Sequence, residues 1–72
     1  MNTNRAAALH VLTLDGTEAT VALEAGKHGG DALVIRDAQA NVLMAMKAEH
    51  VSDRILGTVL DPGTVATVRE VF

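Results

Sequence analysis

Leu9-His10-Val11-Leu12-Thr13-Leu14-Asp15-Gly16 begins the part of the chain that decides the fold. Its first six residues are typical of a strand, and the Asp-Gly pair follows at once. Such a pair is a strong hairpin signal, because both central residues of a type I′ turn need positive φ. The return strand is expected over Glu18–Leu23, where Ala19, Val21 and Leu23 fall on one face. We therefore predict an antiparallel hairpin at the start of the fold.

Two further apolar runs, Ala32–Arg36 and Val42–Lys47, flank the polar segment Asp37–Asn41. This arrangement predicts a second hairpin. The residues from Ala38 to Leu56 are also rich in helix formers, so a helix of about four turns is the alternative for this region. Intrinsic propensity alone favours the helix, whereas pairing with neighbouring strands favours the sheet.

The last third of the sequence has β character. Gly57–Leu60 and Thr64–Val68 lie on either side of Asp61-Pro62-Gly63, in which the proline presets φ and the glycine tolerates positive φ. We expect a chain reversal there between two short strands. The predicted fold class is therefore all-β, with six or seven short antiparallel strands in a single domain over residues 1–72, of which residues 1–7 are expected to fray.

The composition leaves only a small core. Of the 72 residues 35 are apolar, but 12 of these are alanine, so 23 larger apolar side chains remain. In so short a chain, apolar burial at about 25 cal/mol per Å² roughly balances an ordering cost of about 1.5 kcal/mol per residue. Disulfides and cysteine-based zinc sites are excluded because the chain has no cysteine. Self-association is the expected source of additional stability.

Membrane insertion and general nucleic-acid binding are both disfavoured. The longest uninterrupted apolar run is Val42–Met46, whereas a membrane span needs about 20 residues. The N-terminal residues lack a signal-peptide pattern, so we expect a cytoplasmic protein with no membrane partner. The net charge of −3 and the single aromatic residue, Phe72, argue against binding nucleic acid by charge or base stacking alone.

Candidate chemical groups are sparse. His10, His28 and His50 stand in separate segments without metal-ligand spacing, so no metal site is expected. Ser52 beside His50 lacks an oriented third group, and we predict that the chain is not an enzyme. His28 lies in a glycine-rich loop, Ala25–Asp31, where a polar ligand can be held. This loop is not expected to bind phosphate, because it lacks the Gly-Lys-Ser/Thr ending and the helix start of such loops.

Several residues recur at a spacing that is shared with a known family. They are Met1, Thr3 and Asn4, the turn Asp15-Gly16, Leu23, Gly26, the patterns Val42-Leu43-x-Ala45 and Glu49-His50-x-Ser52, and Gly57. With one extra residue in the glycine-rich loop, this order resembles the trp RNA-binding attenuation protein family over the whole chain. The resemblance implies a small antiparallel β subunit that forms a closed homo-oligomeric ring with sheets shared between subunits.

The resemblance also implies a function. Members of that family regulate transcription attenuation by binding single-stranded RNA when free L-tryptophan occupies a site between subunits. For this chain it implies tryptophan or another amino acid as effector, no other cofactor, and further copies of the chain and RNA as partners. In the ligand site Gly26, His50 and Ser52 match the family, and His28 is added from the same glycine-rich loop.

The candidate RNA-binding residues are Arg36 and Arg54. Arg36 stands in the place of a family lysine, and Arg54 is the basic residue nearest to Ile55-Leu56-Gly57, where the family has a Lys-x-Arg pair. Threonine and glutamine residues of the family's ligand site are replaced by Glu24, Gly29, Met46 and Ala48. The alternative function is therefore a ring-shaped structural or scaffold oligomer, natural or engineered, that has lost tryptophan and RNA binding. An Sm-like RNA chaperone subunit is disfavoured, because that fold begins with a helix and residues 1–8 are few for one.

Overall fold

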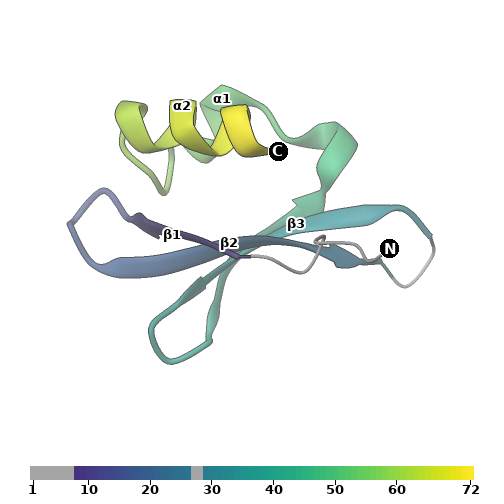
Figure 1. Cartoon of the computed structure of the whole chain (residues 1–72), viewed down its shortest axis with the longest axis horizontal. Helices are drawn as coiled ribbons and strands as arrows, with labels where there is room; N and C mark the ends of the chain where they lie inside the picture. The colour runs from purple at the N-terminus through teal and green to yellow at the C-terminus, as the bar shows by residue number, and fades with distance from the viewer. Residues whose placement is uncertain (1–7, 27–28) are drawn as a thin grey trace.

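A computed structural model describes residues 8–26 and 29–72 and shows a four-stranded antiparallel sheet with helices on one side (Figure 1). The elements in chain order are β1 (Leu9–Leu12), β2 (Glu18–Ala25), β3 (Asp31–Asp37), β4 (Val42–Lys47), the 3-10 turn η1 (Ala48–His50), α1 (Asp53–Leu56) and α2 (Pro62–Val71). The strands lie in the order β1-β2-β3-β4. The predicted antiparallel sheet is confirmed and dominates the structure. No helix in the described ranges is long and apolar enough to cross a membrane.

The first predicted hairpin is present, but its turn differs from the expected type I′. Gly16 N donates to Thr13 O at 2.9 Å, and Thr13 N donates to Thr17 O at 2.9 Å. Of the two residues expected at positive φ, only Gly16 has it, at 86°. The strands are therefore joined by a three-residue loop that ends on a left-handed residue, the next most common hairpin connection after the two-residue turns.

The second hairpin, between β3 and β4, uses the same geometry with alanine in the left-handed position. Asp37 N donates to Asn41 O and Ala40 N donates to Asp37 O, each at 2.9 Å. Ala40 has a φ of 69°, the one positive value of a non-glycine residue in the described part of the chain. Its Cβ makes this conformation unfavourable, because the left-handed region crowds Cβ against the following carbonyl.

Replacing Ala40→Gly is expected to raise the free energy of unfolding by about 1 kcal/mol. Glycine removes the Cβ strain of about 1–2 kcal/mol, and the extra freedom of glycine in the unfolded chain offsets part of the gain. Urea denaturation of the two proteins measures the difference. The matched variant Ala38→Gly, at an exposed position of the same loop without positive φ, should leave stability unchanged or lower it. A less stable Ala40→Gly protein would contradict the strain argument.

The core lies between one face of the sheet and the helices. Alternate strand residues such as Val21 and Ile35 point to this side and have no exposed surface. The buried cluster comprises Val11, Ala19, Val21, Leu33, Ile35, Leu56, Leu60, Val65 and Val68. It is a small cluster built mainly of valine and leucine, in agreement with the composition.

The strand predicted at Thr64–Val68 is wrong, because this segment belongs to α2. Asp61 is the N-cap of the helix, and its Oδ1 accepts a hydrogen bond from Thr64 N at 2.8 Å. Pro62 occupies the first turn, where its fixed φ suits a helix and its missing N–H is not needed. The Asp-Pro-Gly signal therefore begins a helix, and two buried valines of that helix cover the sheet.

The strand predicted at Gly57–Leu60 is also wrong. This segment follows α1 as a turn and meets the sheet through a single bridge between Thr13 and Leu60. The helix alternative for Ala38–Leu56 is partly correct. Strand pairing holds β4 extended, but the chain becomes helical after it, in η1 and α1.

Acid is expected to destabilise this fold through three carboxyl groups in turns and caps. They are Asp15, Asp37 and Asp61, and hydrogen bonds lower the pKa of each below its ordinary value of 3.8. The Thr13 hydroxyl is the main cause at Asp15, and backbone N–H groups are the main cause at the other two. A carboxyl with a lower pKa in the folded state stabilises the fold above its unfolded pKa, and this stabilisation is lost as the pH falls through the folded pKa. Urea midpoints should therefore decline as the pH falls below about 4, and a midpoint that rises on acidification would contradict this account.

Candidate functional site

β4 is an outer strand of the sheet and has a free backbone edge. Within the described residues it pairs on one side, with β3, and nothing pairs with its other side. Its six residues are five apolar ones followed by Lys47. An apolar outer strand of this kind is a template for pairing with another strand.

The register with β3 shows which backbone groups of β4 are free. In an antiparallel ladder, alternate residues direct both N–H and C=O toward the same neighbouring strand. The turn bonds between Asp37 and Asn41 show that Asp37 faces β4, and so therefore does Ile35. Ile35 lies opposite Met44, so Met44 bonds to β3. The next residue, Ala45, consequently presents its N–H and C=O to the free edge.

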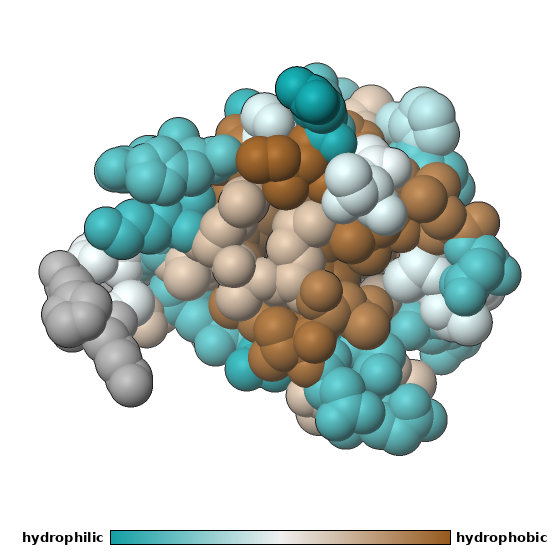
Figure 2. All heavy atoms as spheres, turned by 180° about the vertical axis from the view of Figure 1, so that it is seen from behind, coloured by the Kyte–Doolittle hydropathy of each residue, from teal (hydrophilic) through white to brown (hydrophobic). Residues whose placement is uncertain are grey.

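Apolar side chains surround the start of this edge. A bulge in the pairing with β3 leaves Leu43 without an opposite residue on that strand. Val42 and Leu43 are 53% and 44% exposed. Leu43 also lines, with Leu14 and Val59, a shallow depression of about 330 Å³. An apolar area gathers in the middle of the face seen in Figure 2, with polar residues around it. Exposed apolar groups beside a free strand edge are typical of a protein interaction site.

Among the predicted ligand residues, Gly26 has a structural role in the loop between β2 and β3. Its N–H donates to Gly30 O at 2.8 Å. A Cβ on Gly26 would lie 3.0 Å from Gly30 O and 3.2 Å from Gly29 O. Glycine is therefore needed here for the close approach of two backbone segments. His28, the other loop residue predicted to bind a ligand, lies outside the described residues.

His50 and Ser52 each have a local contact and do not form a shared site with Gly26. Ser52 is the N-cap of α1, and its Oγ accepts a hydrogen bond from Ile55 N at 3.2 Å. His50 is exposed in η1, where its Nε2 lies 3.4 Å from Glu49 Oε2. His50 ends η1, whereas Ser52 follows in an extended conformation directly before α1. A role for either in binding an amino acid stays a prediction.

Ser52→Ala is expected to lower the free energy of unfolding by about 1 kcal/mol, because it leaves a backbone N–H of α1 without its cap. Thermal unfolding with and without excess L-tryptophan measures the effect. The loss should be the same in both conditions, and Ser52→Asp, which keeps a capping oxygen, should restore most of it. A wild-type protein that tryptophan stabilises and a Ser52→Ala protein that it does not would instead assign the hydroxyl to a ligand.

The two candidate RNA-binding residues lie on opposite sides of the sheet. Arg36 is on the face away from the helices, because its neighbour Ile35 points into the core. It is half-buried and forms an ion pair with Glu24. Arg54 is exposed in α1, on the helical side (Figure 1). These two residues therefore form no continuous basic surface on one copy, and the charge of Arg36 is already compensated.

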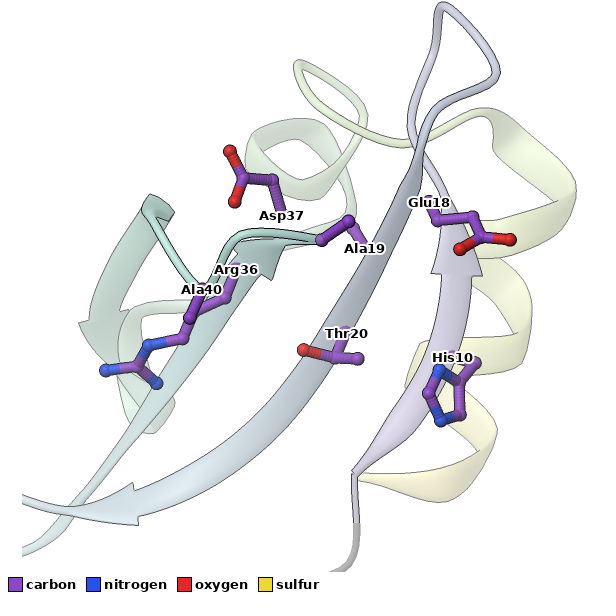
Figure 3. Close-up of a pocket in the computed structure, with 8 residues that line it drawn as sticks. His10, Glu18, Ala19, Thr20, Arg36, Asp37 and Ala40 are labelled. Atoms are coloured by element: carbon purple, nitrogen blue, oxygen red, sulfur yellow. The ribbon is translucent and has the colours of Figure 1, made fainter.

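A depression on the helix-free face lies beside Arg36. It measures about 360 Å³ and is lined by His10, Glu18, Ala19, Thr20, Arg36, Asp37, Ala38 and Ala40. Figure 3 shows the Asp37 carboxylate and the Arg36 guanidinium pointing in different directions. The Asp37 carboxylate accepts hydrogen bonds from Gln39 N and Asn41 N at 2.9 Å. Arg36 and Asp37 therefore serve local contacts and do not converge on a common point, as the polar groups of a ligand pocket do.

Within residues 8–26 and 29–72, no three His, Asp or Glu side chains come together in a way that could hold a metal ion. Comparison with protein-family models, curated proteins and solved structures found no match for the chain. The resemblance to the trp RNA-binding attenuation protein family therefore stays a prediction. The free edge of β4 is the best-formed candidate site in the described part of the molecule.

Residue-by-residue reasoning missed this edge. The sequence signal was present, because Val42–Met46 is the longest apolar run and contains neither proline nor charge. Whether such a strand lies at the centre or the edge of a sheet depends on the order of the strands, and that order appears only in the folded chain.

Proposed function

We propose that the chain is a structural subunit of a homo-oligomer in which the sheet continues from copy to copy through the free edge of β4. The observation that carries this proposal is an outer strand of six residues, five of them apolar, whose outward N–H and C=O groups have no partner among the described residues. Pairing with another strand satisfies these groups and covers the exposed apolar side chains beside them. This is the structural alternative that the sequence leaves open.

The small core gives assembly an energetic advantage. Ten hydrophobic residues are buried in the described ranges, one of them an alanine. For a chain of this size, apolar burial and conformational entropy nearly cancel. Fully burying an exposed large apolar side chain contributes about 1.5–3 kcal/mol, and Val42 and Leu43, at 53% and 44% exposed, have about half of that still to gain. Contact at both residues is therefore a useful fraction of the monomer's own stability.

The ring implied by the resemblance is one form of this assembly. In a ring built from head-to-tail contacts, β4 of one copy meets the other outer strand, β1, of the next copy. Such contacts close when the rotation between copies divides a full turn. Leu12 on β1 is 48% exposed and would be covered in this arrangement.

A tryptophan-gated RNA regulator is the second candidate function. The observation in its favour is Arg36, which lies on the open face of the sheet, where a ring would repeat it from subunit to subunit. A gel-shift assay with RNA that carries spaced GAG and UAG triplets, with and without tryptophan, tests this candidate. A shift that needs tryptophan supports it, and no shift at low salt overturns it.

Native mass spectrometry and light scattering over a range of concentrations test the structural proposal. The expected masses are multiples of 7.5 kDa, with larger species at higher concentration. A folded chain that stays at 7.5 kDa at every concentration would overturn the proposal.

A further inference from the structure

We infer that the β4 edge is occupied by the β4 edge of a second copy, paired antiparallel about a two-fold axis beside Ala45. The inference rests on the proposed function and names the surface through which two copies meet. Joined in this way, the two sheets become one continuous sheet with the helices of both copies on the same side.

The backbone limits the possible registers. In an antiparallel ladder, residues that point outward on one strand face residues that point outward on the other. Placing Ala45 opposite Ala45 of the second copy obeys this rule and brings Lys47 level with Leu43, the residue of the bulge. The pairing then covers the five residues Leu43–Lys47 of each copy. The two Ala45 residues share two backbone hydrogen bonds, and up to about four more form where Lys47 meets Leu43, depending on the bulge.

The side chains fit this pairing on both faces. Ala45 lies on the helix-free face in a cross-strand row with Val34 and Ala22, and its small side chain leaves room for Ala45 of the second copy. On the helical side, Met44 comes opposite Met46 of the second copy. Both methionines are half-buried in a single copy, and flexible thioether side chains adapt well to such a contact.

The charges do not oppose the pairing. The chain carries a net charge of −3, but residues 42–46 include no charged side chain. Lys47 is at the end of β4, so an antiparallel pair places the two lysines at opposite ends of the contact. Each lysine lies opposite Leu43 of the other copy, where its aliphatic stem covers apolar surface and its ammonium group stays in water.

The outer edge of β1 is a less suitable partner than β4 for the β4 edge of a second copy. β1 has only four residues, Leu9–Leu12. Its continuation is already occupied within the chain, because Leu14 N donates to Val59 O at 2.8 Å and Thr13 bridges Leu60. The β4 edge therefore offers the longer free ladder, and two β4 edges offer it to each other.

A single cysteine at position 45 tests the two-fold axis, because the natural chain has no cysteine. Opposed residues of a hydrogen-bonded antiparallel pair have Cα atoms about 5.5 Å apart, within the range of about 4.4–6.8 Å that a disulfide spans. We expect oxidation of the Ala45→Cys protein to give a covalent dimer in high yield. Ala66→Cys, at an exposed position on α2, is the matched control and should stay unlinked.

The other outcomes separate the inference from the proposed function. If the Ala45→Cys protein links only when it is mixed with a His10→Cys protein, β4 meets β1 head to tail, and the inference fails while the oligomer stands. If an oligomer is present and neither pair links, the inference also fails. If all variants remain unlinked at 7.5 kDa, the proposed function fails, and the inference fails with it.

Ala45→Pro supplies a second test. The N–H that proline removes points outward, so the bonds that Met44 makes with β3 are retained, and outer strands tolerate proline at such positions. We expect a folded monomer by circular dichroism and native mass spectrometry. Ala45→Ser keeps the N–H and should associate as the wild type does. A folded Ala45→Pro protein with the wild-type mass would overturn the inference. If Ala45→Pro does not fold, the disulfide cross-linking of the Ala45→Cys protein decides whether two β4 strands pair.

Discussion

Leu60→Ala is expected to lower the free energy of unfolding by about 2–5 kcal/mol, the range for removing a fully buried leucine side chain. Leu60 has no exposed surface and belongs to the core cluster with Leu56, Val65 and Val68. It also forms the bridge to Thr13 that ties the α1–α2 connection to the sheet. Because small domains have total stabilities of only a few kcal/mol, the variant should be largely unfolded at room temperature.

Urea denaturation followed by circular dichroism, repeated at several protein concentrations, measures this effect. The concentration series is needed because self-association would raise the apparent stability by mass action. Leu12→Ala is the matched control, since Leu12 is 48% exposed and its truncation should cost less than about 1 kcal/mol. An equal decrease in the free energy of unfolding for the two variants would show that Leu60 is not packed in the core between the helices and the sheet.

The N-terminal half of the fold was predictable because its signals are local. The Asp15-Gly16 pair and the apolar runs on both sides of it specify a hairpin whichever turn type is used, and the structure contains that hairpin. β3 and β4 were identified in the same way. The exact turn was not predictable, since the sequence does not distinguish a two-residue loop from the three-residue loop that Gly16 closes.

The C-terminal third was predicted wrongly because its signals have two meanings. Asp61-Pro62-Gly63 suits a turn, but aspartate followed by proline also suits the N-cap and first position of a helix. Valine and threonine then favoured a strand by propensity. What decides between them is tertiary, because a sheet with one apolar face needs a covering layer, and Val65 and Val68 at helical spacing supply it.

The candidate site was less predictable than the fold. Ser52 was expected to face a ligand, whereas its hydroxyl caps the short helix α1. Arg36 and Arg54 lie on different sides of the sheet, which their spacing in the sequence does not reveal. The free β4 edge depends on the order of all four strands, so it follows from topology and not from any local motif.

Gly26→Ala is expected to lower the free energy of unfolding by about 1–3 kcal/mol, the usual range for a substitution that forces a packed backbone apart. Its new Cβ would lie 3.0 Å from Gly30 O and 3.2 Å from Gly29 O, and both atoms belong to the backbone. The loop must therefore open, which lengthens the 2.8 Å hydrogen bond from Gly26 N to Gly30 O at the end of the β2–β3 ladder. Thermal and urea unfolding measure the loss.

The same substitution elsewhere separates this steric effect from the general effect of replacing glycine. Gly63→Ala in α2 brings Cβ no closer than 3.5 Å to Asp61 Oδ1, an ordinary contact, and alanine favours the helix. Its stability should be unchanged or slightly higher. If Gly26 serves the loop backbone, the loss in Gly26→Ala is the same with and without tryptophan. A loss that appears only when tryptophan is present would show instead that Gly26 belongs to a ligand site, and would favour the regulator over the structural subunit.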